Sequence, residues 1–421
     1  MTAPLSARAR ALLDSPAVPE YIDTHFERSE DAWHPERNPD GYIAFCIAEN
    51  KLMFDVLGPK IAQSRELDSE SLGYDSMVGS SDFRQAIAAF LSRTFIGREI
   101  DAEHLAVLNG VGSVLELLFY VICDPGDGVL VPTPSYTGFW ADIETRDQVQ
   151  IIPVHTTSES GFRFTLAQLD ETVANADRPV RAMLFTNPNN PLGQIHDDDE
   201  VREIISWAMD KGIHLVLDEI YGLSTFGDQL FRSGAGLVEE MGDLLHIVWG
   251  FSKDFSMSGL RSGVLYSENT DLLSAINGLA YWASTSRDTQ SMLRQLLSDE
   301  AWVDGFLEEN RRRLRASYLA VTEVLDAYGV VHVPADSGLF FVVDARPMMH
   351  DLTWESEDEV WRTLLDEHGV NITPGIECHN AEPGFMRLVF SGVSIDAAVE
   401  GAHRLGRFAS DRMGQLGPTV S

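Results

Sequence analysis

Seven short apolar runs, separated by stretches long enough for helices, constrain the fold of this chain more than any other feature. Most of the runs end in Gly, Pro, Asn or Asp, and they cover residues 105–110, 128–134, 149–155, 181–188, 213–219, 245–252 and 262–267. Amphipathic stretches such as 198–211 lie between them. Apolar strands that alternate with helices are typical of a mainly parallel sheet covered on both faces. The sequence therefore predicts an α/β fold.

The two ends of the chain follow a different pattern. The first 40 residues carry proline and charge with little periodicity, which predicts an arm. Residues 287–328 predict a long helical region interrupted near Asp299, and the segments after it predict a smaller α/β lobe. We therefore expect an N-terminal arm and part of a small domain in residues 1–50, a large domain in 51–295 and a C-terminal small domain in 296–421.

Charge and cysteine content argue against several classes of protein. A formal net charge of -34 repels the phosphate backbone of nucleic acids, so neither nucleic acids nor anionic membranes are expected as partners. The three cysteines are widely spaced and odd in number, unlike a disulfide framework or a zinc site. Together with the lack of a signal-peptide pattern, they favour the cytoplasm. The histidines form no HExxH motif or comparable pair, so a metal site is not indicated.

Polar residues stand at the ends of several predicted strands, where ligands of open α/β sheets bind. Gly110, Gly112 and Ser113 precede an apolar helix. Free N–H groups there can hold a phosphate, although such a glycine turn is more often structural. Asp218 and Tyr221 end another strand, where the carboxylate either caps a helix or meets a proton or cation.

Lys253 is unusual because the chain has only four lysines, and this one ends an apolar run in "HIVWGFSKDF". An amine in apolar surroundings loses basicity and becomes a nucleophile that can form an imine with an aldehyde. Arg261 follows eight residues later, and Arg387 lies in "FMRLVF", where alternation buries every other side chain. A buried arginine usually holds an anion, either internal or on a ligand.

Four ordered motifs carry a family resemblance over about residues 40–410. "TNPNNPLG", "DEIY", "SKDFSMSGLRSG" and "EPGFMRLVF" resemble the signature of fold-type I pyridoxal 5'-phosphate (PLP) enzymes of the class I and II aminotransferase group. The resemblance implies a seven-stranded, mainly parallel sheet sandwiched by helices, with a smaller α/β domain. It also implies PLP as cofactor, an amino acid as substrate, and a homodimer with shared active sites.

The resemblance also assigns roles residue by residue. Lys253 matches the lysine that binds PLP and moves the substrate's α-proton, and Asp218 matches the carboxylate that keeps the pyridine nitrogen protonated. Arg387 matches the clamp on the substrate α-carboxylate. The other matches hold the cofactor: Asn190 and Tyr221 at its phenolic oxygen, Tyr136 against its ring, Gly112, Ser113 and Arg261 around its phosphate, and Ser252 beside Lys253.

Within this group, the chain most resembles 1-aminocyclopropane-1-carboxylate synthases. Its "IAENKL" is similar to their "AENQL", which places Glu49 in the substrate site, and "PTPSYTGF" is similar to "PTPYYPGF". By the same resemblance Tyr74 is a candidate catalytic residue. We expect Tyr74 and residues 286–290 to come from a neighbouring chain.

Three positions depart from the synthase pattern. Gly250 stands where the family usually has a serine that bonds the phosphate. Tyr74 lies five residues before Gly79, as in many aminotransferases, while Met77 occupies the position of the synthases' tyrosine. Arg287 stands within "STSRDTQ", where it either reaches a distal anion on a substrate or begins a helix. These departures put cyclopropane formation in doubt and leave the cofactor chemistry unaffected.

The resemblance thus implies a reaction on S-adenosylmethionine with γ-elimination of methylthioadenosine. Ring closure would follow, or γ-substitution with carbon–carbon bond formation on an acceptor, for which a nicotinamide nucleotide in secondary metabolism is one candidate. An ordinary aminotransferase that uses a 2-oxo acid would employ the same residues. A non-catalytic PLP-binding regulator is a remote third alternative, because the short acidic arm leaves no room for a DNA-binding domain.

Overall fold

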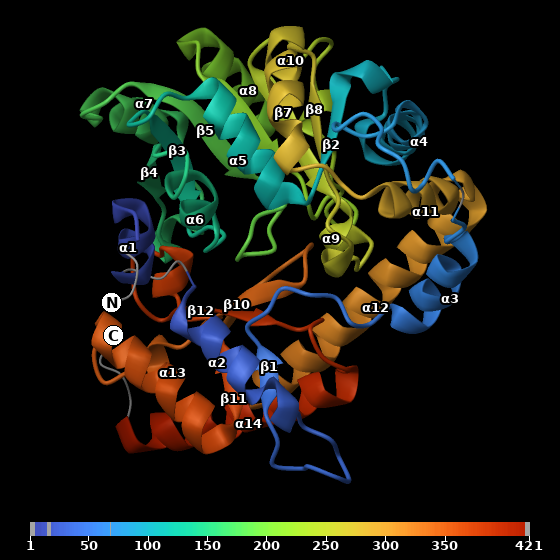
Figure 1. Ribbon diagram of the computed structural model, residues 1–421. Coiled ribbons are helices and arrows are strands. Elements are labelled where there is room, and N and C mark those ends of the chain that lie inside the picture. Colours follow the sequence, from blue (N-terminus) through green and yellow to red (C-terminus); the bar gives the residue numbers. More distant parts are fainter. Residues whose placement is uncertain (1–4, 15–17, 68, 417–421) are drawn as a thin grey trace.

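The computed structural model describes residues 5–14, 18–67 and 69–416. Figure 1 shows two parts, one built on a large sheet and the other containing segments from both ends of the chain. The long helix α12 (Glu300–Ala327) runs from the first part into the second.

The large sheet has seven strands in the order β2-β8-β7-β6-β5-β3-β4. All neighbouring pairs are parallel except those of β8, which is antiparallel to both β2 and β7. The strands are β2 (Leu105–Leu108), β3 (Gly128–Thr133), β4 (Gln150–His155), β5 (Val180–Thr186), β6 (His214–Asp218), β7 (Leu245–Gly250) and β8 (Gly263–Ser267). The predicted α/β fold with a mainly parallel sheet is confirmed.

Helices cover both faces of this sheet (Figure 1). Along β6, Leu215 and Leu217 pack into one apolar core, while Val216 packs into the core on the opposite face. The first core contains α3 (Phe54–Ser64), α4 (Ser81–Leu91), α7 (Leu166–Asn175), α8 (Asp198–Lys211) and α11 (Arg287–Ser298). The second contains α5 (Val111–Ile122), α6 (Phe139–Glu144) and α10 (Thr270–Leu279). Burial of each Leu or Val side chain stabilises the folded state by about 1.5–3 kcal/mol, which is why the strands are apolar throughout.

Three neighbouring parallel strands end at the same edge of the sheet. Thr186 ends β5 opposite Asp218, which ends β6. The adjacent strand β7 ends at Gly250 and leads directly into the short helix α9 (Phe251–Asp254). The segments that carry Asn190, Tyr221 and Lys253 therefore start from one edge.

The second part contains two small sheets and the helices around them. Strands β9 (His332–Val333), β10 (Phe340–Asp344) and β12 (Phe385–Val389) are antiparallel, in the order β12-β10-β9, and β1 (Ile43–Phe45) pairs in parallel with β11 (Val370–Ile372). Strands β1, β10, β11 and β12 share a core with α12, α13 (Trp354–His368) and α14 (Ile395–Leu416). The predicted interruption near Asp299 is confirmed, because α11 ends at Ser298 and the Asp299 side chain accepts a hydrogen bond from the Trp302 N–H in the first turn of α12.

The segment predicted as an N-terminal arm contains two helices. The described residues there form α1 (Ala7–Asp14) and α2 (Glu20–Arg28). Tyr21 of α2 is buried, and its carbonyl accepts a hydrogen bond of 2.9 Å from Asn371 Nδ2 in β11. Helix α1 buries no residue and α2 buries only this one, so neither leaves a clear apolar period in the sequence.

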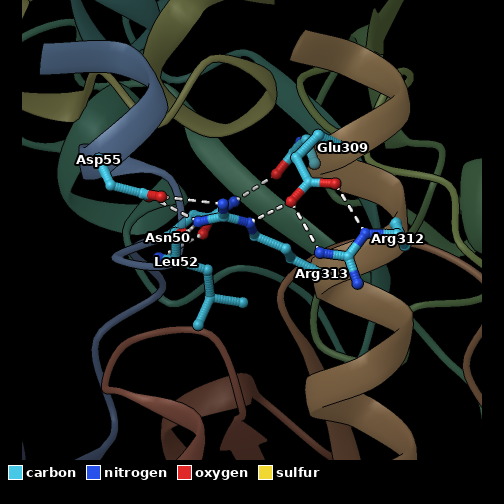
Figure 2. Close-up of polar contacts among 7 residues, drawn as sticks. Asn50, Leu52, Asp55, Glu309, Arg312 and Arg313 are labelled. Atoms are coloured by element: carbon cyan, nitrogen blue, oxygen red, sulfur yellow. Dashed lines mark hydrogen bonds and ion pairs between the residues drawn. The ribbon is translucent and has the colours of Figure 1, made fainter. Parts of the chain in front are cut away.

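An ionic network fixes the segment after β1 against α12 (Figure 2). The Arg313 guanidinium of α12 donates to the Leu52 carbonyl and to both Asp55 oxygens, at 2.5, 2.6 and 2.9 Å. Glu309 accepts from both Arg312 and Arg313, which lowers the pKa of its carboxyl to about 2. Residues 50–55 are therefore tied to the helix, and they continue the backbone that passes beside Lys253.

Candidate active site

A cavity of about 180 Å³ lies at the edge where β5, β6 and β7 end. Eight residues proposed from the sequence line it: Gly112, Tyr136, Asn190, Asp218, Tyr221, Ser252, Lys253 and Arg261. Segments that are far apart in the chain are thus brought together around one space.

Lys253 presents its amine to this cavity from α9. Its Nζ donates a hydrogen bond of 2.7 Å to the Ala48 carbonyl. Burial and, to a smaller degree, the nearby Arg387 guanidinium lower the pKa of Lys253 to about 8. A useful fraction of the amine is therefore unprotonated near neutral pH, as a nucleophile requires.

Asp218 lies at the end of β6 and is only 4% exposed. Its carboxyl accepts hydrogen bonds from the Ile220 N–H at 3.3 Å and from the Thr186 hydroxyl at 3.4 Å. Burial raises the pKa of this carboxyl to about 7. Within the described ranges no basic side chain forms an ion pair with Asp218, so a protonated ring nitrogen in the cavity would supply the missing partner.

Asn190 and Tyr221 form a hydrogen-bonded pair. Asn190 Nδ2 donates to the Tyr221 hydroxyl at 3.3 Å, while Asn190 Oδ1 accepts from Arg387 Nη1 at 3.0 Å. Burial raises the pKa of Tyr221, so its hydroxyl keeps its proton and can donate it to an oxygen in the cavity. The two side chains can therefore orient a planar oxygen-bearing ligand.

Arg387 lies on β12, is 2% exposed, and has no carboxylate partner among the residues that the structure describes. Besides Asn190, its guanidinium donates to the Cys46 carbonyl at 2.9 Å and to the Thr373 hydroxyl at 3.1 Å. Its Nε is buried without a hydrogen-bond partner. A buried cation with only neutral partners is costly, and a carboxylate from a ligand would remove that cost.

The first turn of α5 and Arg261 form an anion site. Gly110, with φ of 91°, precedes the helix, and a Cβ there would lie 2.5 Å from Arg261 Nη2, so the guanidinium packs directly on that backbone. Arg261 Nη1 donates to the Ser258 carbonyl at 3.0 Å, which holds it in place. A guanidinium beside free N–H groups at a helix start is suited to a phosphate.

The glycine at position 250 has a steric explanation. A Cβ there would lie 2.9 Å from Val111 Cγ2 and 3.0 Å from the Ser262 carbonyl. The Val111 side chain thus crowds the space that a serine at 250 would need. The substitution removes one hydroxyl from the anion site, while Ser258 lines the cavity nearby.

Five of the proposed residues are not among those that line the cavity of this chain, and one of them, Arg387, instead contacts its wall through the hydrogen bond to Asn190. Tyr74 is 94% exposed, and Arg287 begins α11 and pairs with Asp75 at 2.9 Å. Contact of Arg287 with a substrate anion stays a prediction. Glu49 lines an adjoining cavity that shares Ser258 with the first. The Ser113 hydroxyl donates to the Asn109 carbonyl, which leaves its backbone N–H for a ligand. That Tyr74 acts in a neighbouring chain's site stays a prediction.

Sequence reasoning missed Asp142, Ser258 and the Ala48 carbonyl. Asp142 lines the cavity beside Phe139 on the same side of α6. The spacing of three residues within a helix was a usable signal, because such positions share one face. The Ala48 carbonyl had none, because a backbone group leaves no mark in the residue types.

The described ranges contain no group of three or more His, Cys, Asp or Glu side chains that could hold a metal ion. Among the same residues, no helix has the length and apolar character needed to cross a bilayer.

Comparison with known families decides the identity. The family model described as aminotransferase class I and II matches residues 42–405. The chain belongs to the class I and II aminotransferase family. Enzymes of this family depend on PLP, and the chain is accordingly a PLP-dependent enzyme.

Several similar curated proteins are 1-aminocyclopropane-1-carboxylate synthases. Synthase 6 of Arabidopsis thaliana is 34% identical over 93% of this chain and 82% of its own length, and synthase 2 of Solanum lycopersicum is 33% identical over 92% and 84%. Among solved structures, the aspartate aminotransferase of Thermus thermophilus with maleate has a TM-score of 0.80 at 22% identity, covering 96% of this chain and 99% of that one. That likeness shows the shared fold.

The residues present fit PLP at both ends of the cofactor. Asp218 is a buried carboxyl without a cation, Lys253 is a nucleophilic amine beside it, and Arg261 with the α5 turn offers an anion site on the same cavity. These needs correspond to the ring nitrogen, the aldehyde and the phosphate of the cofactor.

Proposed function

We propose that this aminotransferase-family enzyme acts on S-adenosylmethionine. It expels methylthioadenosine from the γ-carbon and then closes a ring or transfers the remaining four-carbon unit to an acceptor. The observation that carries the proposal is the electrostatic setting of Lys253. Among the described residues, Arg387 is a buried cation without a carboxylate partner, and Glu49 is a carboxylate that lines the adjoining cavity. An amino acid with a carboxylate at one end and a positive charge at the other matches this pattern.

In the proposed complex, Lys253, Asp218, Asn190, Tyr221 and Arg261 hold PLP, and Tyr136 lies against its ring. When bound, PLP supplies an electron sink for negative charge at the substrate's α-carbon. The Asp218 carboxylate keeps a proton on the ring nitrogen, because the pair then satisfies two charges that are each costly alone in this buried position.

Arg387 binds the substrate α-carboxylate through its unpartnered Nε and its Nη groups. Its rigid fork then fixes the orientation of the α-carbon. Lys253 accepts the α-proton, a task for which a pKa lowered to about 8 is well suited near neutral pH. The Ala48 carbonyl holds the amine between steps by accepting its hydrogen bond.

Glu49 is proposed to face the positive sulfur of the substrate. Its carboxylate is 3.8 Å from Lys51 Nζ, a long ion pair between two partly exposed side chains. Such a pair contributes little, so the carboxylate remains available for a cationic ligand. Because the sulfonium leaves as a neutral thioether, its departure needs no acid from the protein.

The test is incubation of purified, PLP-loaded enzyme with S-adenosylmethionine, followed by mass spectrometry of the products. Methylthioadenosine formed in proportion to enzyme, and absent with Lys253→Ala, supports the proposal. No methylthioadenosine, together with 2-oxo-acid-dependent amino transfer, would replace it by the aminotransferase alternative. That alternative is favoured by the position of Tyr74 relative to Gly79.

We also propose a cytoplasmic homodimer with shared sites. Leu72 and Tyr74 on a loop, and Tyr281 and Trp282 in a 3₁₀ turn shortly before α11, are all more than half exposed. A second copy would cover such apolar side chains. All three cysteines are free and buried, as suits a reducing compartment. Light scattering after gel filtration would test the dimer, and a monomer that turns over substrate would contradict shared sites.

A further inference from the structure

Asp142 lies on the wall of the cofactor cavity, across the first turn of α5 from Arg261. A Cβ on Gly112 would lie 3.3 Å from Asp142 Oδ1, just as a Cβ on Gly110 would meet Arg261. The two charged side chains thus flank the same helix start from different sides. They form no ion pair with each other, and both line the cavity. A group bound at this helix start therefore contacts a cation on one side and a carboxyl on the other.

Within the described residues, the Asp142 carboxyl has no hydrogen-bond or ion-pair partner. The charged groups around it are Arg261, Glu116 on α5, and Asp218 at the end of β6. Glu116 is itself paired with Arg146 at 2.6 Å. Lys253 and the Tyr136 hydroxyl line the same cavity. Arg261 thus provides the main positive charge near Asp142, and it faces the space in which a phosphate would bind.

A phosphate dianion beside an ionised carboxylate would meet repulsion in a partly desolvated site. A protonated carboxyl has the opposite effect, because it has an O–H to donate to a phosphate oxygen. The anion site also lacks one hydroxyl donor, since position 250 is a glycine. Only the acid form of Asp142 is therefore compatible with tight phosphate binding.

We propose that Asp142 takes part in cofactor binding as a carboxylic acid that donates a hydrogen bond to the phosphate, so that binding takes up a proton. The inference rests on the cofactor occupying this cavity with its phosphate at α5. Burial raises the pKa of Asp142 to about 6, with Arg261 opposing the rise, and a bound dianion would raise it further. The pKa of Asp142 is thus lower in the free protein than in the complex. Between these two values the affinity for the phosphate must fall as the pH increases.

The test is equilibrium binding of pyridoxamine 5'-phosphate, which carries the phosphate but no aldehyde for Lys253. Its Kd would be measured by protein fluorescence from pH 5.5 to 8.5 for the wild type, Asp142→Asn and Asp142→Ala. We expect the wild-type Kd to weaken about tenfold more than that of Asp142→Asn between pH 6 and pH 8. The asparagine variant keeps a donor without the charge, so it should bind more tightly than the alanine variant.

Asp147→Asn is the matched control. Burial raises the pKa of Asp147 to about 7, but this carboxyl lines a separate cavity behind α6 with Trp140 and Glu144. It should leave the wild-type pH profile unchanged. Equal pH profiles for the wild type and Asp142→Asn would overturn the inference, and equal affinity of the asparagine and alanine variants would overturn the hydrogen bond. No binding by any variant would instead refute the cofactor site itself.

Calorimetry gives a readout that a purely structural role would not produce. The heat of binding at pH 7.5 would be measured in two buffers with different ionisation enthalpies. Wild-type protein should take up more protons per bound ligand than Asp142→Asn, and an equal number would contradict the proposal.

Discussion

The inner wall of the site and its outer rim differ in how completely one chain assembles them. On the inner wall, Lys253 and Asp218 are held by neighbouring backbone, and their pKa values are shifted toward neutrality by burial. On the rim, Glu49 is paired only loosely with Lys51, and Tyr74 is almost fully exposed. The inner wall is thus prepared before a substrate arrives, whereas the rim acquires partners only when something binds to it.

This difference separates the general chemistry from the choice of substrate. Groups with shifted pKa values in a desolvated cavity are suited to proton transfer and covalent binding. Half-exposed charges contribute less energy each, yet they distinguish one substrate side chain from another. Substitutions on the inner wall should therefore abolish all reactions together, and substitutions on the rim should change the preference among substrates.

The largest effect is expected for Lys253→Ala, which removes both the nucleophile and the proton acceptor. Turnover with any amino acid should fall by at least about 1000-fold. Covalent attachment of PLP after borohydride reduction, read by mass spectrometry, should disappear. Lys211→Ala, which removes a surface lysine paired with Asp170, is the control and should behave as wild type. Retention of covalent PLP at another lysine would contradict the assignment of Lys253 as the PLP-binding lysine.

The second prediction concerns the pH dependence of PLP capture by the cofactor-free protein. With a pKa of about 8, about 1% of the Lys253 amine is neutral at pH 6 and about half at pH 8. Because only the neutral amine attacks, the capture rate followed by absorbance should rise about 50-fold over this range and then level off. A capture rate that still rises up to pH 10 would mean that the Lys253 amine has an ordinary pKa and that burial has not prepared it for attack.

Arg387→Met should raise KM for amino-acid substrates by about 10- to 30-fold, with a smaller change in kcat, because a charge-assisted hydrogen-bond pair is lost. Steady-state kinetics measures this directly. Arg404→Met is the matched control, since Arg404 is equally buried but bonds backbone carbonyls and Glu400 instead. A similar KM increase in both variants would indicate general damage.

The smallest effects are expected on the rim. Glu49→Gln should raise KM for S-adenosylmethionine by about two- to fivefold, the usual contribution of a partly exposed ion pair. Lys51→Met should lower it, because the variant removes the competing cation. An uncharged amino acid tested in parallel should show neither change. If each variant changed KM equally for the charged and the uncharged substrate, the rim would have no role in selecting substrates by charge.

Much of the inner wall could be predicted because parallel strands bring their ends together. The apolar runs before Asp218 and Lys253 identify adjacent strands, and the edge they share follows from the topology. Arg387 could be placed in the interior because it stands inside an apolar strand, and all residues of β12 are buried. These residues are positioned by regular structure, whose spacing is visible in a sequence.

The rim and Asp142 were harder to place for physical reasons. Tyr74 lies on an irregular loop, where no period fixes the direction of a side chain. Asp142 resembles any other acidic residue on a helix until the packing of α6 against α5 turns it toward the cavity. Helices α1 and α2 are too short and too exposed for their pattern to show.

The pairing of β1 with β11 has a consequence for how the protein must be made. Ile43 lies opposite Val370, so β1 leaves the ribosome long before its partner strand β11 has been synthesised. During that interval, the backbone that later offers the Ala48 carbonyl and its tie to Arg313 has no fixed place. Truncated fragments that end before Val370 should consequently expose apolar surface and depend on chaperones.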